Sequence, residues 1–256
     1  MNKPKVFHIL ILLLIFAGFF DQAHAQTLRI AVAANAQGVI KKLQADFKKR
    51  TGISTEAIIG ASGKLTTQIM NGAPYDLFLS ADTDFPDQLY AGGYGLKRPK
   101  IYALGSLIVC STTADDVMNW QSLVAGMQVK KIAIANPKTA PYGRAATESL
   151  KYYHLDDQVA SKLVQGESIA QVNAYLQTGV VGIGFTSEAF LYENKDKQKI
   201  RWARVDEKSY AKIEQAVILL PYAKKTGVDK ATKFYDYLSS APARKIIANS
   251  GYHLPK

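Results

Sequence analysis

Short apolar runs alternate along this chain with segments whose apolar residues recur every three or four positions. In the first third, three such runs predict buried strands, at residues 27–34, 54–60 and 76–81. The segment after the first run carries four apolar residues on one face of a predicted helix: Val39, Ile40, Leu43 and Phe47. Gly52 ends that helix. Such strand–helix alternation predicts a parallel sheet covered by helices on both faces.

The middle of the chain repeats the plan. Residues 130–136 and 180–186 are further predicted strands, and helices are expected to begin near Tyr142 and after Ser168. Two similar sets predict an α/β protein of two lobes, each a mainly parallel sheet flanked by helices. The apolar segments 102–111 and 214–222 are expected to join the lobes.

The lobes are therefore expected to be discontinuous in sequence. Lobe I is predicted to comprise residues 26–105 and 218–256, and lobe II residues 106–217. Two helical patterns near the C-terminus, at 228–240 and 241–250, are expected to complete lobe I.

The first 25 residues have the layout of a secretory signal peptide. Lys3 and Lys5 precede an apolar run at 7–20, and Ala23-His24-Ala25 offers a cleavage site after Ala25. The run has 14 residues, short for a membrane span of about 20. An uncleaved membrane anchor is the alternative. We expect an exported protein.

The charge pattern and the few cysteines and histidines argue against nucleic-acid binding, a disulfide and a histidine-based metal site. The formal net charge is +11, and removing the leader leaves +10. The positive residues are scattered, without the interleaved aromatics of a base-stacking groove, so nucleic acid is not an expected partner. Cys110 is the only cysteine, so no intramolecular disulfide can form. His154 and His253 have no neighbouring ligands at metal-site spacing.

Four predicted strand-to-helix junctions carry the candidate chemistry. They are Ala34-Asn35, Ala61-Ser62-Gly63, Pro141-Tyr142-Gly143 and Ser168-Ile169. In a parallel sheet such turns lie at the carboxyl ends of the strands, where ligands bind. Helix starts leave backbone N–H groups without partners and carry partial positive charge, so several aimed at one cleft form an anion site. The alternative for Asn35, Ser62 and Ser168 is that they are ordinary N-caps.

From about Leu28 to Leu254 the chain resembles the periplasmic molybdate-binding proteins of bacterial ABC importers. The matching motifs are "AVAAN", "GASGKLTTQIMNGAPYDLFLSAD", "NPKTAPYGRAATESL", "ESIAQVNAYLQTGVVGIGFTSEA" and "FYDYLSSAPARKIIANSGY". The resemblance implies a monomeric two-lobed binding protein that closes on molybdate or tungstate in the cleft between its lobes. It also implies no other cofactor, and delivery of the anion to a membrane permease with its ATPase.

The resemblance also implies a set of ligand-binding residues. Asn35 and Ser62 would bind from the first lobe; Tyr142 and Ile169 would bind from the second, Ile169 through its backbone N–H. Ala34, Gly63 and Phe185 would lie beside them in the cleft. Many members have serine at the position of Asn35 and tyrosine at that of Phe185. The hydroxyl of Tyr142 is therefore expected to replace the one that Phe185 lacks.

The residue types agree with such a ligand. A deprotonated tetrahedral oxyanion accepts hydrogen bonds and donates none, and the proposed lining has hydroxyl, amide and N–H donors but no carboxylate. Monohydrogen phosphate carries a proton that would face only donors, so it should be rejected. Sulfate or chromate has the same charge, and either remains an alternative ligand.

Two alternatives come from other classes. A serine-dependent hydrolase would use Ser62 as nucleophile with His154 or His253 as base, but no third orienting residue is present. A ferric-ion binding protein could use Tyr152 and Tyr153, although their place at the end of a helical pattern favours packing.

Overall fold

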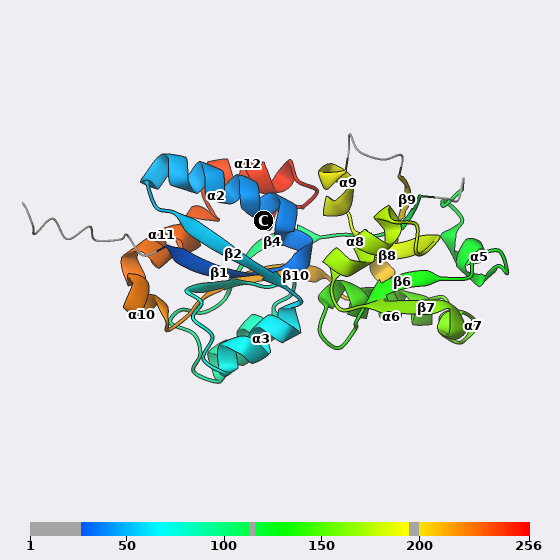
Figure 1. Cartoon of the computed structure of the whole chain (residues 1–256), viewed down its shortest axis with the longest axis horizontal. Coiled ribbons are helices and arrows are strands. Elements are labelled where there is room, and N and C mark those ends of the chain that lie inside the picture. Colours follow the sequence, from blue (N-terminus) through cyan, green and yellow to red (C-terminus); the bar gives the residue numbers. More distant parts are fainter. Residues whose placement is uncertain (1–26, 113–115, 195–199) are drawn as a thin grey trace, which may run out of the picture.

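The computed structural model describes residues 27–112, 116–194 and 200–256. The predicted signal peptide lies outside these residues. In the described part of the chain, none of the helices is long and apolar enough to cross a bilayer. Figure 1 shows two α/β bodies side by side along the long axis, each built around its own sheet. The two-lobed α/β class predicted from the alternation is confirmed.

The first sheet has the strand order β2-β1-β3-β10-β4. Its strands are β1 (Leu28–Ala33), β2 (Thr55–Gly60), β3 (Leu77–Leu79), β4 (Lys100–Gly105) and β10 (Ile213–Leu219). The helices of this lobe are α2 (Gln37–Thr51), α3 (Ser62–Met70), α4 (Asp84–Ala91), α10 (Ala223–Thr226), α11 (Val228–Tyr237) and α12 (Ala241–Ala248), with the 3₁₀ turn η1 (Ala34–Ala36). The C-terminal helices return to this lobe, and Figure 1 places α12 beside α2.

The second sheet has the order β7-β6-β8-β5-β9. Its strands are β5 (Leu107–Ser111), β6 (Ile132–Ala135), β7 (Leu163–Gly166), β8 (Ile183–Ser187) and β9 (Arg201–Arg204). Around it lie α5 (Trp120–Ala125), α6 (Pro141–Tyr152), α7 (Asp156–Val159), α8 (Ile169–Gln177) and α9 (Ala189–Glu193), with the 3₁₀ turns η2 (Ala160–Lys162) and η3 (Glu207–Ser209).

The predicted apolar face of the first helix, α2, is confirmed. All four apolar residues on the predicted face of α2 are buried, and Gly52 ends the helix with a positive φ of 73°. Phe47, on that face, meets Phe234 of α11 edge to face at a centroid distance of 4.9 Å. This contact joins the N-terminal and C-terminal parts of the chain in one core.

One strand in each sheet runs against the others. β10 is antiparallel to β3 and β4, and β5 is antiparallel to β8 and β9. Both enter their sheet directly from the other lobe: β4 leads through Ser106 into β5, and residues 205–212 lead from β9 into β10. The predicted lobe boundary at 217–218 falls inside β10, and the exact lobe limits remain predictions.

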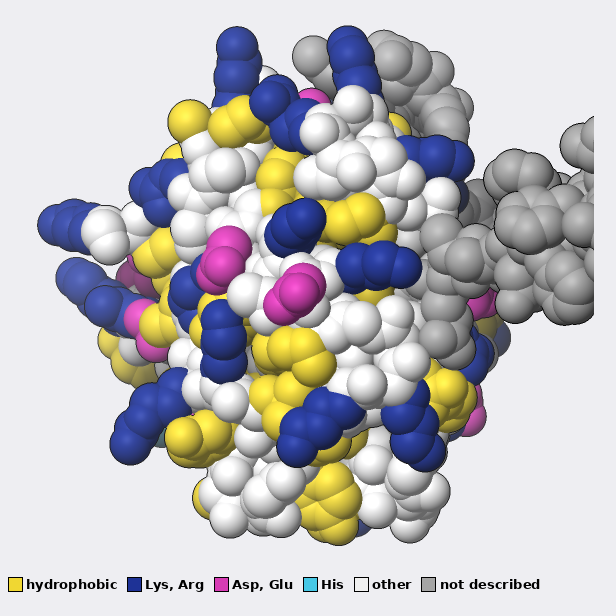
Figure 2. All heavy atoms as spheres, turned by 90° about the vertical axis from the view of Figure 1, so that its left-hand side faces the viewer, with side chains coloured by type: hydrophobic (Ala, Val, Ile, Leu, Met, Phe, Trp, Pro, Cys, Tyr) yellow, Lys and Arg dark blue, Asp and Glu magenta, His cyan; other side chains and the backbone are white. Residues whose placement is uncertain are grey.

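Positive charge is dispersed on the surface in view. Figure 2 looks at the outer end of the first lobe, where Lys and Arg side chains stand apart, separated by polar and apolar atoms. This distribution is typical of a solvated face rather than a continuous track for a polyanion.

Candidate functional site

The four predicted junctions meet at a small pocket between the lobes. Ala34, Asn35 and Ser62 line it from the first lobe, and Tyr142 and Ile169 line it from the second. The other lining residues are Pro141 and four alanines. Among the described residues that line the pocket, none is acidic or basic. Asn35, Ser62, Tyr142 and Ile169 are each at most 3% exposed.

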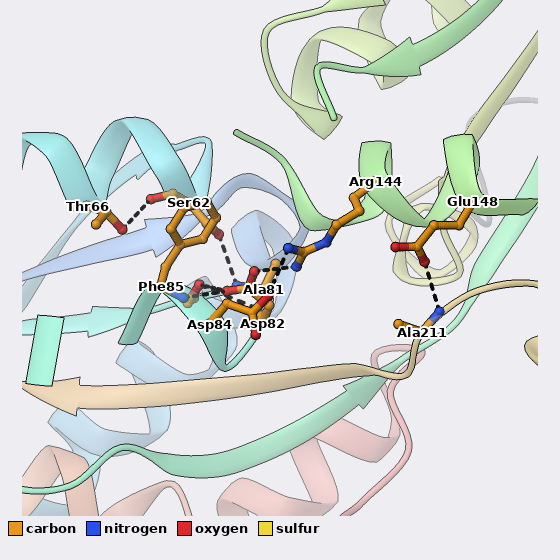
Figure 3. Close-up of polar contacts among 10 residues, drawn as sticks. Ser62, Thr66, Ala81, Asp82, Asp84, Phe85, Arg144, Glu148 and Ala211 are labelled. Carbon is orange, nitrogen blue, oxygen red and sulfur yellow. Dashed lines mark hydrogen bonds and ion pairs between the residues drawn. The ribbon is translucent and has the colours of Figure 1, made fainter. Parts of the chain in front are cut away.

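Ser62 is turned into this pocket by a contact within its own lobe. It is the first residue of α3, and its Oγ accepts a hydrogen bond from the backbone N–H of Ala81 at 3.1 Å (Figure 3). A hydroxyl that accepts from a fixed N–H keeps its own proton for another acceptor. Ser62 can therefore donate to a bound anion.

The interpretation of Ser62 as an N-cap is wrong. The cap position of α3 is Ala61, whose side chain has no acceptor, and the Ser62 hydroxyl accepts from Ala81 instead. Asn35 lies inside η1, and Ser168 holds the cap position of α8 without a side-chain cap bond. At these three junctions no side chain at the cap position accepts from the first-turn N–H groups.

Tyr142 reaches the pocket from the second residue of α6, directly after Pro141. Its hydroxyl accepts a hydrogen bond from Gln215 Nε2 at 3.3 Å. Burial raises the pKa of Tyr142 well above its usual value, and the nearby phenol of Tyr102 adds to the shift. The hydroxyl thus keeps its proton and, like that of Ser62, can donate it. A Cβ at Gly105 would overlap this hydroxyl, so glycine is needed at the end of β4.

The side-chain amide of Asn35 does not supply donors to the pocket. Its Nδ2 donates to Gln215 Oε1 at 2.9 Å and to the Tyr252 hydroxyl at 3.2 Å, which uses both amide hydrogens. The backbone N–H of Asn35 belongs to the first turn of η1 and has no acceptor within that helix. This differs from the expected amide donor.

Ile169 begins α8, so its N–H also lacks an acceptor within the helix. The N–H groups of Gln171 and Val172 both return to the Ser168 carbonyl, at 3.1 and 3.2 Å. The first-turn N–H groups before them have no acceptor within the helix.

Two residues expected in the cleft lie outside the pocket lining. Gly63 donates its N–H to the Thr139 carbonyl across the lobes at 2.9 Å. A Cβ there would lie 3.0 Å from Thr139 Cα, so glycine allows the lobes to approach. Phe185 is fully buried in β8, where it meets Trp120 edge to face at 5.4 Å.

Ion pairs hold the two lobes together beside the pocket. Arg144 of α6 donates to Asp82 Oδ2 at 2.7 Å and to Asp84 Oδ2 at 2.8 Å (Figure 3). Burial raises the pKa of Asp82, against the lowering effects of the Ser80 hydrogen bond and the Arg144 charge. Arg144 and Asp82 both lie in the motifs quoted above, but no local sequence pattern predicts an ion pair between them.

The tyrosines considered for a ferric-ion site and the histidines considered as the base of a serine hydrolase do not line this pocket. Tyr152 and Tyr153 are at the end of α6, and Tyr153 packs edge to face on Trp120 at 5.3 Å. His253 pairs through its backbone with Leu104. Within the described residues, no group of three or more His, Cys, Asp or Glu side chains is arranged to hold a metal ion.

The chain is similar to known proteins over most of its length. The family model of the bacterial extracellular solute-binding proteins matches residues 28–253. The molybdate-binding protein ModA of Azotobacter vinelandii is 33% identical over 233 residues, which is 91% of this chain and 92% of that protein. ModA of Rhodobacter capsulatus is 35% identical, over 87% of this chain and 86% of that protein. The solved structure of the Azotobacter vinelandii periplasmic molybdate-binding protein superposes with a TM-score of 0.84 at 31% identity, over 90% of this chain and 100% of that chain.

Proposed function

The chain belongs to the bacterial extracellular solute-binding proteins, and we propose that it captures molybdate or tungstate between its lobes. The ligand binds as a tetrahedral dianion in the pocket formed by Asn35, Ser62, Tyr142 and Ile169. Likeness to proteins named as molybdate-binding, at 33% and 35% identity, supports this choice of ligand.

The observation that carries the proposal is the direction of the two pocket hydroxyls. Ser62 accepts from Ala81 and Tyr142 accepts from Gln215, so each has its single proton left for the pocket. The helix starts at Asn35 and Ile169 add backbone N–H groups and partial positive charge. Such a lining suits an anion whose oxygens all accept.

The same lining discriminates against anions that carry a proton. Monohydrogen phosphate would set its O–H against groups that only donate, which leaves a buried donor unpaired at about 1–3 kcal/mol. Sulfate and chromate carry no proton and have the same charge as molybdate. Discrimination among these dianions rests on the size of the pocket, because the hydrogen-bond pattern is identical.

Binding is coupled to contact between the lobes. Arg144 on one lobe and Asp82 and Asp84 on the other meet next to the pocket, and the Gly63 N–H bonds to Thr139 across the cleft. An anion that bonds to both lobes adds to these contacts and favours the closed arrangement. The closed protein then delivers the anion to the permease and ATPase of an importer, after export to the periplasm and cleavage after Ala25.

Isothermal titration calorimetry of the mature protein tests the ligand assignment. Molybdate and tungstate are expected to bind at a ratio of one to one. Sulfate is expected to bind more weakly than molybdate, and monohydrogen phosphate at about pH 8 more weakly than sulfate. Binding of phosphate as tight as that of molybdate would refute the donor-only site.

A further inference from the structure

A network of buried hydrogen bonds connects Tyr142 to Tyr252 through Gln215 and Asn35. The Tyr252 hydroxyl donates to the Asn35 carbonyl at 2.7 Å and accepts from Asn35 Nδ2 at 3.2 Å. Asn35 Nδ2 also donates to Gln215 Oε1 at 2.9 Å, and Tyr102 donates to the same oxygen at 3.1 Å. Gln215 Nε2 in turn donates to Tyr142 at 3.3 Å. All five residues are at most 4% exposed.

The chemistry of the groups fixes the direction of every bond in this network. A backbone carbonyl can only accept, so the single proton of Tyr252 must go to the Asn35 carbonyl. The Tyr252 oxygen then requires a donor from the Asn35 side chain, which sets Nδ2 rather than Oδ1 towards it. The other hydrogen of Nδ2 requires an acceptor, and Gln215 Oε1 provides it.

With Oε1 fixed, the Gln215 amide has only one orientation. Reversing it would place Nε2 against Asn35 Nδ2, which can only donate, leaving two buried donors face to face. Nε2 therefore faces Tyr142, and the Tyr142 hydroxyl must accept on that side.

The local backbone explains how Gln215 and Tyr102 come together. Gln215 and Ala216 of β10 pair with Ala103 and Ile101 of β4, so Tyr102 is the extra residue of a β-bulge. Bulges turn side chains that a regular ladder would keep apart. Here the bulge brings the Tyr102 hydroxyl to Gln215 Oε1 as a second donor.

We propose that Gln215 is a positioning residue that determines specificity, because it makes the Tyr142 hydroxyl an obligate donor to the pocket. This inference rests on the proposed function, namely that the pocket binds an oxyanion. Gln215 does not line the pocket: its Nε2 acts through Tyr142, and its Oε1 holds the Asn35 side-chain amide. Without its amide, Tyr142 can turn a lone pair to the pocket and accept a proton from the ligand.

Sulfate and monohydrogen phosphate provide the test, because they are similar in size and charge and differ by one proton. The affinity of each is measured by competition with molybdate at about pH 8 in the wild type and in Gln215→Met, which keeps the side-chain length. The wild type is expected to prefer sulfate. In Gln215→Met the ratio of sulfate to phosphate affinity should fall about tenfold, the loss of one hydrogen-bond preference.

A double-mutant cycle with Tyr142→Phe shows whether the effect passes through the hydroxyl. In the Tyr142→Phe background, Gln215→Met should leave the sulfate-to-phosphate ratio unchanged. Tyr252→Phe removes the hydroxyl proton that fixes the direction of these hydrogen bonds, so it should also lower the sulfate-to-phosphate affinity ratio. This second variant provides the test if Gln215→Met does not fold. Tyr75→Phe is the matched control, since the Tyr75 hydroxyl donates to Gln68 Oε1 at 2.9 Å outside this network.

The outcomes separate the two claims. If the wild type binds none of the oxyanions, the proposed function fails. If the wild type binds molybdate but Gln215→Met and Tyr252→Phe weaken sulfate and phosphate by the same factor, Gln215 is only structural and the inference is overturned. A shift of the ratio in Tyr75→Phe equal to that in Gln215→Met would overturn it as well.

Discussion

Removing the Ser62 hydroxyl has two separable effects, both calculable from its contacts. Ser62 is 1% exposed, and its Oγ is the acceptor for the Ala81 N–H at 3.1 Å. In Ser62→Ala the unliganded protein keeps that N–H buried without a partner, which lowers the free energy of unfolding by about 1–3 kcal/mol. The bound anion loses a donor, which weakens binding by about 1.5–3 kcal/mol. The dissociation constant therefore rises roughly 10- to 150-fold.

Thr66→Val is the control for this variant. Thr66 is also buried on α3, and its Oγ1 donates to the Ser62 carbonyl at 2.9 Å, but it does not line the pocket. The free energy of unfolding of the Thr66→Val protein should fall by about 1 kcal/mol, and its affinity for molybdate should equal that of the wild type. Calorimetric titration gives the affinities, and thermal melts without ligand give the stabilities. A Ser62→Ala protein with the affinity of the Thr66→Val protein would show that Ser62 only supports Ala81.

Three further predictions concern Tyr142, its neighbours and the contact between lobes. Tyr142→Phe should weaken molybdate binding by about 1.5–3 kcal/mol in calorimetry, and adding Phe185→Tyr should recover none of it, because Phe185 packs on Trp120 outside the pocket. If Phe185→Tyr restored the lost affinity, the new hydroxyl would have to contact the anion, which would contradict the position of Phe185 outside the pocket. Arg144→Gln should reduce affinity by up to about fivefold, since a partly exposed ion pair contributes about 1 kcal/mol at most, and a loss of 100-fold would make it a ligand contact. Because burial raises the Tyr142 pKa well above 10.0, its proton is retained below that pKa and lost only above it. Molybdate affinity measured from about pH 7 to 9 should therefore be level, and a decline across that range would contradict the buried donor.

Much of the fold could be predicted because it depends on local periodicity. The face of α2 and its end at Gly52 follow from spacing within 15 residues, and so do the buried face and start of α8. The direction of β5 and β10 could not be predicted, since a short apolar run has the same pattern in either orientation. Both strands run against their neighbours because each enters its sheet from the other lobe.

The pocket residues were identified by junction and motif, but the groups that orient them were not. Gln215 bonds to Asn35 across 180 positions of sequence, and no local pattern connects them. A glutamine within the apolar segment 214–222 is the one available signal, because a buried amide in a strand requires partners. The error at Ser62 has a similar origin: a serine before a helical pattern fits a cap equally well, and only the position of Ala81 decides.

The most direct measurement is a crystal structure of the mature protein with molybdate, using the anomalous scattering of molybdenum to locate the ion. We expect one peak between the lobes, with molybdate oxygens about 2.7–3.1 Å from Ser62 Oγ, the Tyr142 hydroxyl and the Ile169 N–H. Gln215 should keep its bond to Tyr142. A peak at another site, or a bound ion without contacts to either hydroxyl, would contradict the proposed binding site.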